Sequence, residues 1–184
     1  MNSVYAYFTA TTTQKQTSNT TSIIQIGFTD ATNATINSVT VTENTKILPG
    51  QTIQINGGIK NTGSASFYAL IEICLYITKV GGTETIIQSD VYTITQQGLK
   101  QLEFSDEQDK YTTEACALNY NTTTNVGESI NFSTSYEFGF YEYDNTYQGA
   151  TFRYSITAYA IQKFVIEDAV EATNLIAEQI TSLS

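Results

Sequence analysis

An alternating β-strand pattern opens the chain, and no neighbouring strand in the sequence is placed to pair with it. Its apolar side chains share one side, at Val4, Ala6, Phe8 and Ala10. A period of two gives a strand one apolar face that must be covered. The polar run 11–21 that follows is a flexible tether and dictates no hairpin partner. We therefore expect the strand either to fold back onto its own domain or to add to the open sheet edge of another subunit.

Short strands separated by turns continue along the chain. The strongest covers 67–77 and is apolar on both faces, so we expect it in the centre of a sandwich or under an outer cover. The runs 130–140 and 152–160 are separated by a turn at 143–146, which predicts a hairpin. The stretch 105–125 is irregular and is expected to be a long connection. Regularly spaced short strands with turn signals indicate a β-sandwich.

The period changes near the C-terminus. Apolar or small residues recur there at helical spacing, at Ile166, Val170, Thr173, Ala177 and Ile180. The spacing predicts a helix from about Glu167 to Thr181. The domain organisation expected is an N-terminal extension at 1–21, a β-sandwich body at 22–165 and a C-terminal helix at 166–184.

The composition argues against several classes of function. The chain has 184 residues, a formal charge of −10 and no histidine. Without histidine there is no Ser-His-Asp or Cys-His arrangement and no His-ligated metal site. No phosphate loop or dinucleotide fingerprint is present. We therefore expect a protein that is not an enzyme, with no catalytic residues and no cofactor.

Charge and hydropathy limit the partners in the same way. The eight Lys and Arg residues are scattered singly, which argues against nucleic-acid binding. No run of about 20 apolar residues is present, so we expect no membrane span. The densest acidic cluster lacks the spacing of a calcium loop and is expected to be a solvated turn rather than a metal site; it consists of Glu103, Asp106, Glu107 and Asp109. A chain rich in Thr, Ser and Asn is typical of an exposed extracellular or virion β-protein.

Two cysteines, Cys74 and Cys116, allow one disulfide. Two separate buried thiols, each acting as a small apolar group, are an equal alternative. The sequence favours neither.

Four N-glycosylation sequons occur, at Asn19, Asn33, Asn121 and Asn131. With this much Thr and Ser, chance would give about as many, so their number proves nothing. Their positions in the tether, a turn, the irregular stretch and a strand face would let all four carry N-glycans if a glycosylating cell secretes the protein. The first residues, Met1 to Ala6, fit either the remnant of a cleaved signal or an intact start.

One stretch resembles a known pattern. It reads Ile47-Leu48-Pro49-Gly50-Gln51-Thr52-Ile53-Gln54-Ile55, followed by Ile59-Lys60-Asn61-Thr62-Gly63-Ser64-Ala65. A Pro-Gly turn, a strand, Asn-Thr-Gly and another strand resemble Ig-like domains of the CARDB kind and the TasA/camelysin group of secreted fibre proteins. The start Tyr5-Ala6-Tyr7-Phe8-Thr9 is similar to the mature beginning of such fibre subunits, and archaeal surface threads and bundling pili are similar in plan. The resemblance covers roughly the first ninety residues.

The resemblance implies an all-β fold: an Ig-like or jelly-roll β-sandwich with an N-terminal donor strand and, here, a short C-terminal helix. It further implies a structural subunit of an extracellular filament on the cell surface, a pilus or thread. Such a subunit polymerises head to tail with itself by donor-strand complementation, with Val4, Ala6, Phe8 and Ala10 entering the next copy. The alternative is a capsid decoration or minor capsid protein of a virion. A carbohydrate-binding module that uses Tyr141 and Tyr143 is a third class.

Overall fold

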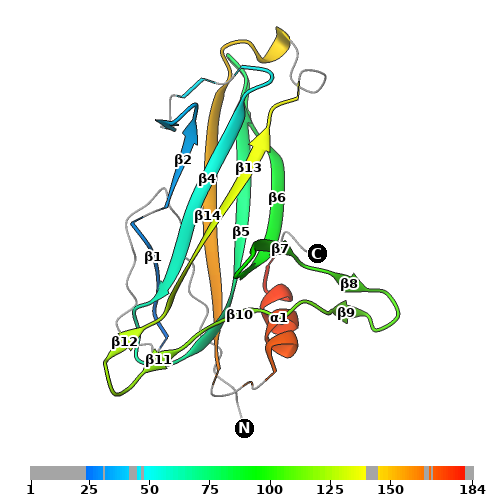
Figure 1. The fold of residues 1–184 in the computed structure, drawn as a ribbon. Helices are drawn as coiled ribbons and strands as arrows, with labels where there is room; N and C mark the ends of the chain where they lie inside the picture. Colours follow the sequence, from blue (N-terminus) through cyan, green and yellow to red (C-terminus); the bar gives the residue numbers. More distant parts are fainter. Residues whose placement is uncertain are drawn as a thin grey trace.

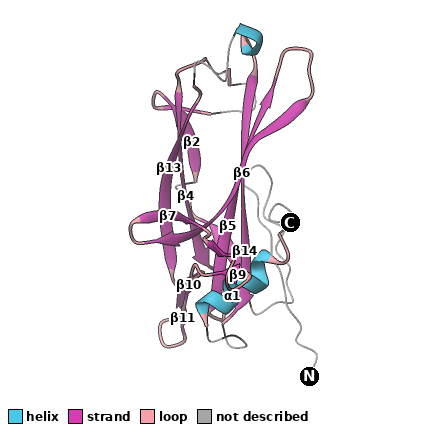
Figure 2. Cartoon of the chain, turned by 90° about the vertical axis from the view of Figure 1, so that its right-hand side faces the viewer, coloured by secondary structure: helices cyan, strands magenta, loops and turns pink. Residues whose placement is uncertain are grey.

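The computed structural model describes residues 24–30, 32–41, 45–46, 48–139, 145–163, 166 and 168–180. This part of the chain is mostly β-strand in antiparallel sheets, with one short helix near the C-terminus (Figure 1). The all-β class predicted from the sequence is therefore confirmed. Two five-stranded sheets form two layers, and two small two-stranded sheets extend from them (Figure 2).

The first sheet is organised around β4, Thr52–Asn61. Along one edge of β4 runs β13, Ser129–Glu137, in an unbroken antiparallel register. Along the other edge lie β1, Ile26–Phe28, and then β2, Asn33–Ile36, each pairing with a different half of β4. The two-residue strand β3, Val39–Thr40, pairs with β2 and ends the sheet on that side.

The second sheet is organised around β5, Phe67–Thr78. Its full length pairs with β14, Thr151–Gln162. On the other side β5 pairs with β6, Glu84–Thr95, and with β10, Cys116–Leu118, again one after the other. The strand β7, Gly98–Gln101, pairs with β6.

The predicted hairpin between the two long C-terminal strands is wrong. β13 pairs with β4 and β14 pairs with β5, so the connection between them crosses from one sheet to the other. Steric fit explains the choice of β4 as a partner. Phe132 lies directly opposite Gly57, and a Cβ atom at Gly57 would collide with the Phe132 ring. The absence of a side chain at Gly57 therefore makes room for the aromatic ring of β13.

The inner faces of the two sheets share one core. Most of the alternating residues of β4, β5, β13 and β14 that face it are apolar, and Ile53, Phe67 and Ile156 are fully buried. Phe138, which follows β13, packs edge to face on Phe152 of β14 with ring centroids 5.4 Å apart. This contact joins the two sheets at one end of the core.

A second cluster covers the outer face of β5. The helix α1, Ala169–Ala177, packs there, and its Ile176 is fully buried with Tyr68 and Leu70 of β5. The outer cover, one of the two alternatives predicted for this strand, is thus confirmed. Asp168 is the N-cap and accepts hydrogen bonds from the backbone N–H groups of the first turn. The helix is shorter than the predicted span from Glu167 to Thr181.

The stretch predicted as an irregular connection contains short strands. β8, Phe104–Ser105, pairs with β9, Lys110–Tyr111, and β11, Tyr120–Asn121, pairs with β12, Val126–Gly127. Asn174 of α1 holds the β8–β9 hairpin in place: its amide donates to the C=O of Tyr111 and accepts from the Tyr111 N–H, each at 2.8 Å. A single 3-10 turn, Asn145–Tyr147, precedes β14.

Candidate assembly site

The outer edge of β14, a strand of 12 residues, borders the core. The register of β14 with β5 continues one residue past Gln162, because the Lys163 N–H donates to the C=O of Ser66 at 3.0 Å. In an antiparallel pair, every second residue bonds to the partner and the others turn their backbone groups away. The even-numbered residues of β14 therefore face the outer edge. Phe152 agrees, since its N–H donates across that edge to the C=O of Thr45 at 3.2 Å.

From Ile156 onward this edge is covered but not laddered by any residue that the structure describes. Ile156, Ala158 and Ala160 are each 0% exposed, and no strand among the described residues pairs with their outer side. Buried backbone N–H and C=O groups are almost always hydrogen-bonded in folded proteins. The outward backbone groups of Ile156, Ala158 and Ala160 therefore need hydrogen-bond partners beyond the described strands.

The surroundings of this edge suit a strand with one apolar face. β1 and β2 lie on the same side of the molecule as β14 (Figure 1), and their buried residues Ile26, Ala34 and Ile36 belong to the same core as β14. An incoming strand would complete the wall between the two layers. A bridge between Lys46 and Thr151 closes one end of the position.

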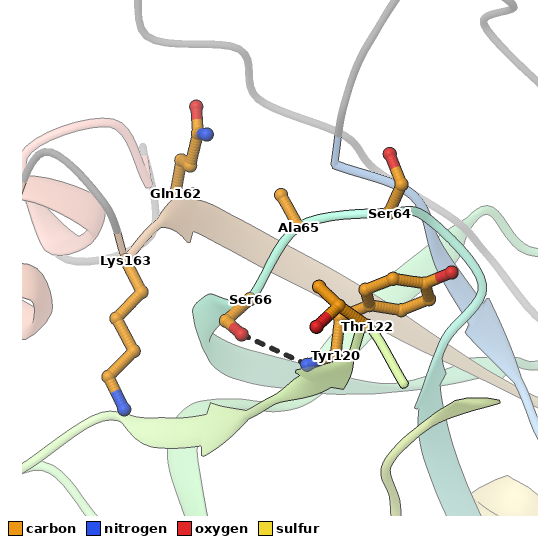
Figure 3. A pocket seen from close by; sticks show the side chains of 7 residues that line it. All are labelled: Ser64, Ala65, Ser66, Tyr120, Thr122, Gln162 and Lys163. Carbon is orange, nitrogen blue, oxygen red and sulfur yellow. Dashed lines mark hydrogen bonds between the residues drawn. The ribbon is translucent and has the colours of Figure 1, made fainter. Parts of the chain in front are cut away.

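A small cleft lies at the other end of β14. It has a volume of about 340 Å³ and combines the loop before β5, the segment around β11 and the last residues of β14. Tyr120 lies against Ser66 there, and its N–H donates to the Ser66 hydroxyl at 2.9 Å (Figure 3). The cleft leaves the Gln162 end of the position accessible. Its lining residues are Ser64, Ala65, Ser66, Tyr120, Thr122, Gln162 and Lys163.

The predicted donor residues Val4, Ala6, Phe8 and Ala10 lie outside the described residues, as does Asn19. Their placement stays a prediction, and so does the division of the chain at residues 21 and 165.

The other three sequon asparagines lie on polar surfaces. Asn33 and Asn131 are on the outer face of the first sheet, where Asn131 is exposed and Asn33 is half-buried and bonded to Asn56 at 3.2 Å. Asn121 is exposed, and its side-chain oxygen accepts the Thr123 N–H at 2.9 Å in a local turn. Whether any of them carries a glycan stays a prediction.

The two cysteines are free thiols in the structure, which agrees with the predicted alternative of two separate buried thiols. They lie on opposite faces of the second sheet: Cys116 joins the inner core and pairs with Ala69, whereas Cys74 lies beside Ser89 on the outer face at 3.4 Å. Burial raises the pKa of the Cys116 thiol to about 11. Because the thiolate is the reactive form and Cys116 is buried, this thiol is a poor nucleophile at neutral pH.

A buried carboxylate on the outer face of β5 has no counterpart in the sequence predictions. Glu72 is 9% exposed and accepts hydrogen bonds from the Tyr159 hydroxyl at 2.7 Å and from Ser89 at 3.3 Å. Burial, followed by the bond to Glu72, raises the pKa of Tyr159. Alternation within an apolar strand could have indicated that Glu72 is buried, but not its partners. The arrangement is a satisfied structural network.

Two further observations concern metals and membranes. Among the described residues, no group of three or more His, Cys, Asp and Glu side chains is arranged to hold a metal ion. No helix in the same part of the chain combines the length and apolar character needed to cross a bilayer.

Comparisons with protein-family models, with curated proteins and with solved structures gave no match.

Proposed function

We propose that this protein is a structural subunit of an extracellular filament, a pilus or thread, that polymerises by donor-strand complementation. In this proposal the two-layered body is an Ig-like sandwich that lacks one strand, and the segment from Val4 to Thr13 of one copy fills the outer edge of β14 in the next. The observation that carries the proposal is that edge itself, where Ile156, Ala158 and Ala160 are fully buried without a ladder partner among the described residues.

The N-terminal pattern suits this edge in length and in polarity. The seven residues of Val4–Ala10 equal in number the seven residues 156–162. Ile156, Ala158 and Ala160 turn their side chains into the core, so an added strand would place its own apolar face beside them. The face with Val4, Ala6, Phe8 and Ala10 would meet this requirement, and the tyrosine and threonine face would point outward.

Burial of the apolar face supplies the driving force for such an addition. Burial of an alternating strand of this size contributes on the order of 10 kcal/mol gross at about 25 cal/mol per Å² of apolar area. Ordering of the arm and loss of rotational and translational freedom subtract a large part of it. Because the arm and the edge are different surfaces, the contact is heterologous and propagates into an open fibre instead of a closed dimer.

The polar surface is compatible with a filament exposed to solvent. On the outer face of the first sheet, Gln54, Asn56 and Ser133 form a network of uncharged side-chain hydrogen bonds across β4 and β13. In these two strands the charged residues are Lys60 and Glu137, at opposite ends of the pairing, so the face is hydrated mainly by uncharged polar groups.

Removal of the arm tests the proposal. A chain that lacks residues 1–13 should fold and should give no filaments by negative-stain electron microscopy. A matched pair of point variants separates the two faces of the arm: Phe8→Asp should abolish filaments, whereas Tyr7→Asp should preserve them. Long filaments from the truncated chain would contradict strand donation.

A further inference from the structure

A buried asparagine supports the cleft at the Gln162 end of β14. Asn61, the last residue of β4, is 4% exposed, and its side chain bonds to three backbone groups. Its amide donates to the C=O of Ala65 at 2.8 Å and of Leu118 at 3.2 Å, and its oxygen accepts the Gly63 N–H at 3.0 Å. Loss of any of these bonds would leave a buried polar group without a partner, which costs free energy. The loop before β5 is therefore fixed against the end of β10, which leads into β11.

The ring of Tyr120 is held in the wall of this cleft from both ends of the residue. Its backbone N–H donates to the Ser66 hydroxyl at 2.9 Å, and its phenol hydroxyl donates to the side-chain oxygen of Asn125 at 3.1 Å across the β11–β12 hairpin. Tyr120 is half-buried, and Thr122 lies beside it (Figure 3). A ligand can therefore pack on the ring without first ordering a mobile side chain.

The groups that the cleft offers to a ligand are uncharged. Among the described residues that line it there is no acidic residue and one basic residue, Lys163. The Lys163 ammonium donates to the side-chain oxygen of Asn119 at 3.2 Å and lies over the Tyr68 ring, 5.5 Å from its centroid. Figure 3 shows this side chain directed away from that of Gln162. The cleft then offers three hydroxyl groups, one amide and one aromatic ring, which belong to Ser64, Ser66, Thr122, Gln162 and Tyr120.

We propose that this cleft binds a neutral sugar. A sugar ring carries hydroxyl groups that both donate and accept hydrogen bonds, and it presents C–H groups on one face. The hydroxyl groups match the donors and acceptors of serine, threonine and glutamine side chains, and the C–H face packs on the negatively polarised face of an aromatic ring. The cleft volume of about 340 Å³ is at the small end of the range for ligand sites and suits about one or two sugar units.

Other classes of ligand fit the cleft less well. A phosphate or carboxylate group needs a cation to pair with, whereas the Lys163 ammonium is bonded to Asn119 and the chain carries a formal charge of −10, which repels anions. An apolar ligand needs a mostly hydrophobic lining, whereas six of the seven residues that line this cleft have a polar group in the side chain. Sugar binding would be a second activity of the subunit, and it does not depend on strand donation.

Ligand-observed NMR on the full chain tests this proposal. Saturation-transfer difference spectra are recorded with glucose, galactose, mannose, N-acetylglucosamine, maltose, cellobiose and lactose, each at a concentration suited to a dissociation constant of about 1 mM. Glucuronic acid is the anionic comparison. We expect transfer to at least one of the neutral sugars and none to glucuronic acid. The same sugar should shift the backbone amide signals of Ser66, Tyr120 and Thr122 in the labelled chain and leave those of β13 unchanged.

Four variants connect the binding to the cleft. Tyr120→Ala removes the ring and should weaken binding roughly tenfold, whereas Tyr120→Phe keeps the ring and should bind. Thr122→Val removes a hydroxyl at nearly constant volume and should also weaken binding. Phe104→Ala is the matched control, because it removes a ring that is 51% exposed on the β8–β9 hairpin and should bind as the unmodified chain does. Circular dichroism checks that each variant is folded.

The test also separates sugar binding from filament assembly. Phe8→Asp should bind the sugar as tightly as the unmodified chain, and Tyr120→Ala should still form filaments if strand donation operates. The proposal is overturned if none of the neutral sugars gives saturation transfer or if glucuronic acid binds more tightly than they do. It is also overturned if the shifted amides lie outside the cleft, or if Tyr120→Ala and Thr122→Val bind as the unmodified chain does.

Discussion

Replacing Ala158 with proline should separate the stability of the subunit from its assembly. The Ala158 N–H faces the outer edge of β14 and contributes nothing to the ladder with β5. Proline is tolerated in an edge strand where the N–H is not used. Thr157, one residue earlier, bonds to β5 opposite Glu72, so proline at that position removes a ladder bond and introduces a steric clash.

The structure gives the size of each effect. In the subunit, the ring carbons added at Ala158 cost about 1 kcal/mol through local overpacking. In the assembled state the variant loses one ladder bond, about 1 kcal/mol, and leaves a carbonyl of the incoming strand buried without a partner, about 2 kcal/mol. Since about 1.4 kcal/mol corresponds to a tenfold change, assembly should weaken by roughly two orders of magnitude. Thr157→Pro should instead destabilise the subunit by about 3 kcal/mol.

Two assays distinguish these effects. Thermal unfolding measures subunit stability, and sedimentation of filaments over a range of protein concentrations gives the critical concentration for assembly. Ala158→Gly is the matched control because it keeps the N–H and should polymerise. The reasoning fails if Ala158→Pro polymerises at the wild-type concentration. It also fails if Ala158→Pro unfolds the subunit as Thr157→Pro does, because the outer edge would then be paired within the same chain.

Three further predictions concern the body. Asn174→Ala removes both bonds to Tyr111 and should lower the free energy of unfolding by about 2 kcal/mol, with faster proteolysis of the β8–β9 hairpin as a second readout. Burial raises the pKa of Cys116 to about 11 from an ordinary value near 9, so the unfolded state binds fewer protons than the folded state between these pH values. Denaturation at stepped pH should therefore give a free energy of unfolding that does not change below pH 9 and falls by up to about 3 kcal/mol towards pH 11. The fall should be smaller in Cys116→Ala. The hydrogen bond from Arg153 lowers the pKa of Glu84, so this exposed pair stabilises fully above the ordinary carboxyl pKa and loses its effect as the pH falls through the lowered value. Glu84→Gln should cost no more than about 0.5 kcal/mol at pH 7, and this cost should shrink on acidification when unfolding is followed by fluorescence.

The sequence predicted best the elements whose side chains carry a long periodic signal. The central position of β5 follows from a strand that is apolar on both faces, and the structure places the core on one face and α1 on the other. The C-terminal helix follows from the change in period, although its ends depend on local contacts such as the Asp168 cap. These features are properties of one segment and can be recognised within it.

Strand pairing could not be predicted in the same way, because it depends on two distant segments. β13 and β14 are neighbours in the sequence and look like a hairpin, yet β13 fits beside β4, where Gly57 leaves space for Phe132. The short strands between 105 and 125 have two or three residues each, too few for a period. β10 can be recognised only from its pairing with β5. The outer edge of β14 can be recognised only once the strands around it are known.

The central claim is that the leading arm of one copy completes the outer edge of β14 in another. Hydrogen exchange of a chain lacking residues 1–13, measured with and without a synthetic peptide of those residues, tests it most directly. The account predicts that the peptide slows exchange at the amides of Ile156, Ala158 and Ala160 and leaves those of Thr157, Tyr159 and the β13 edge unchanged. Unaltered exchange at the three even-numbered amides, or protection at β13 in their place, would contradict it.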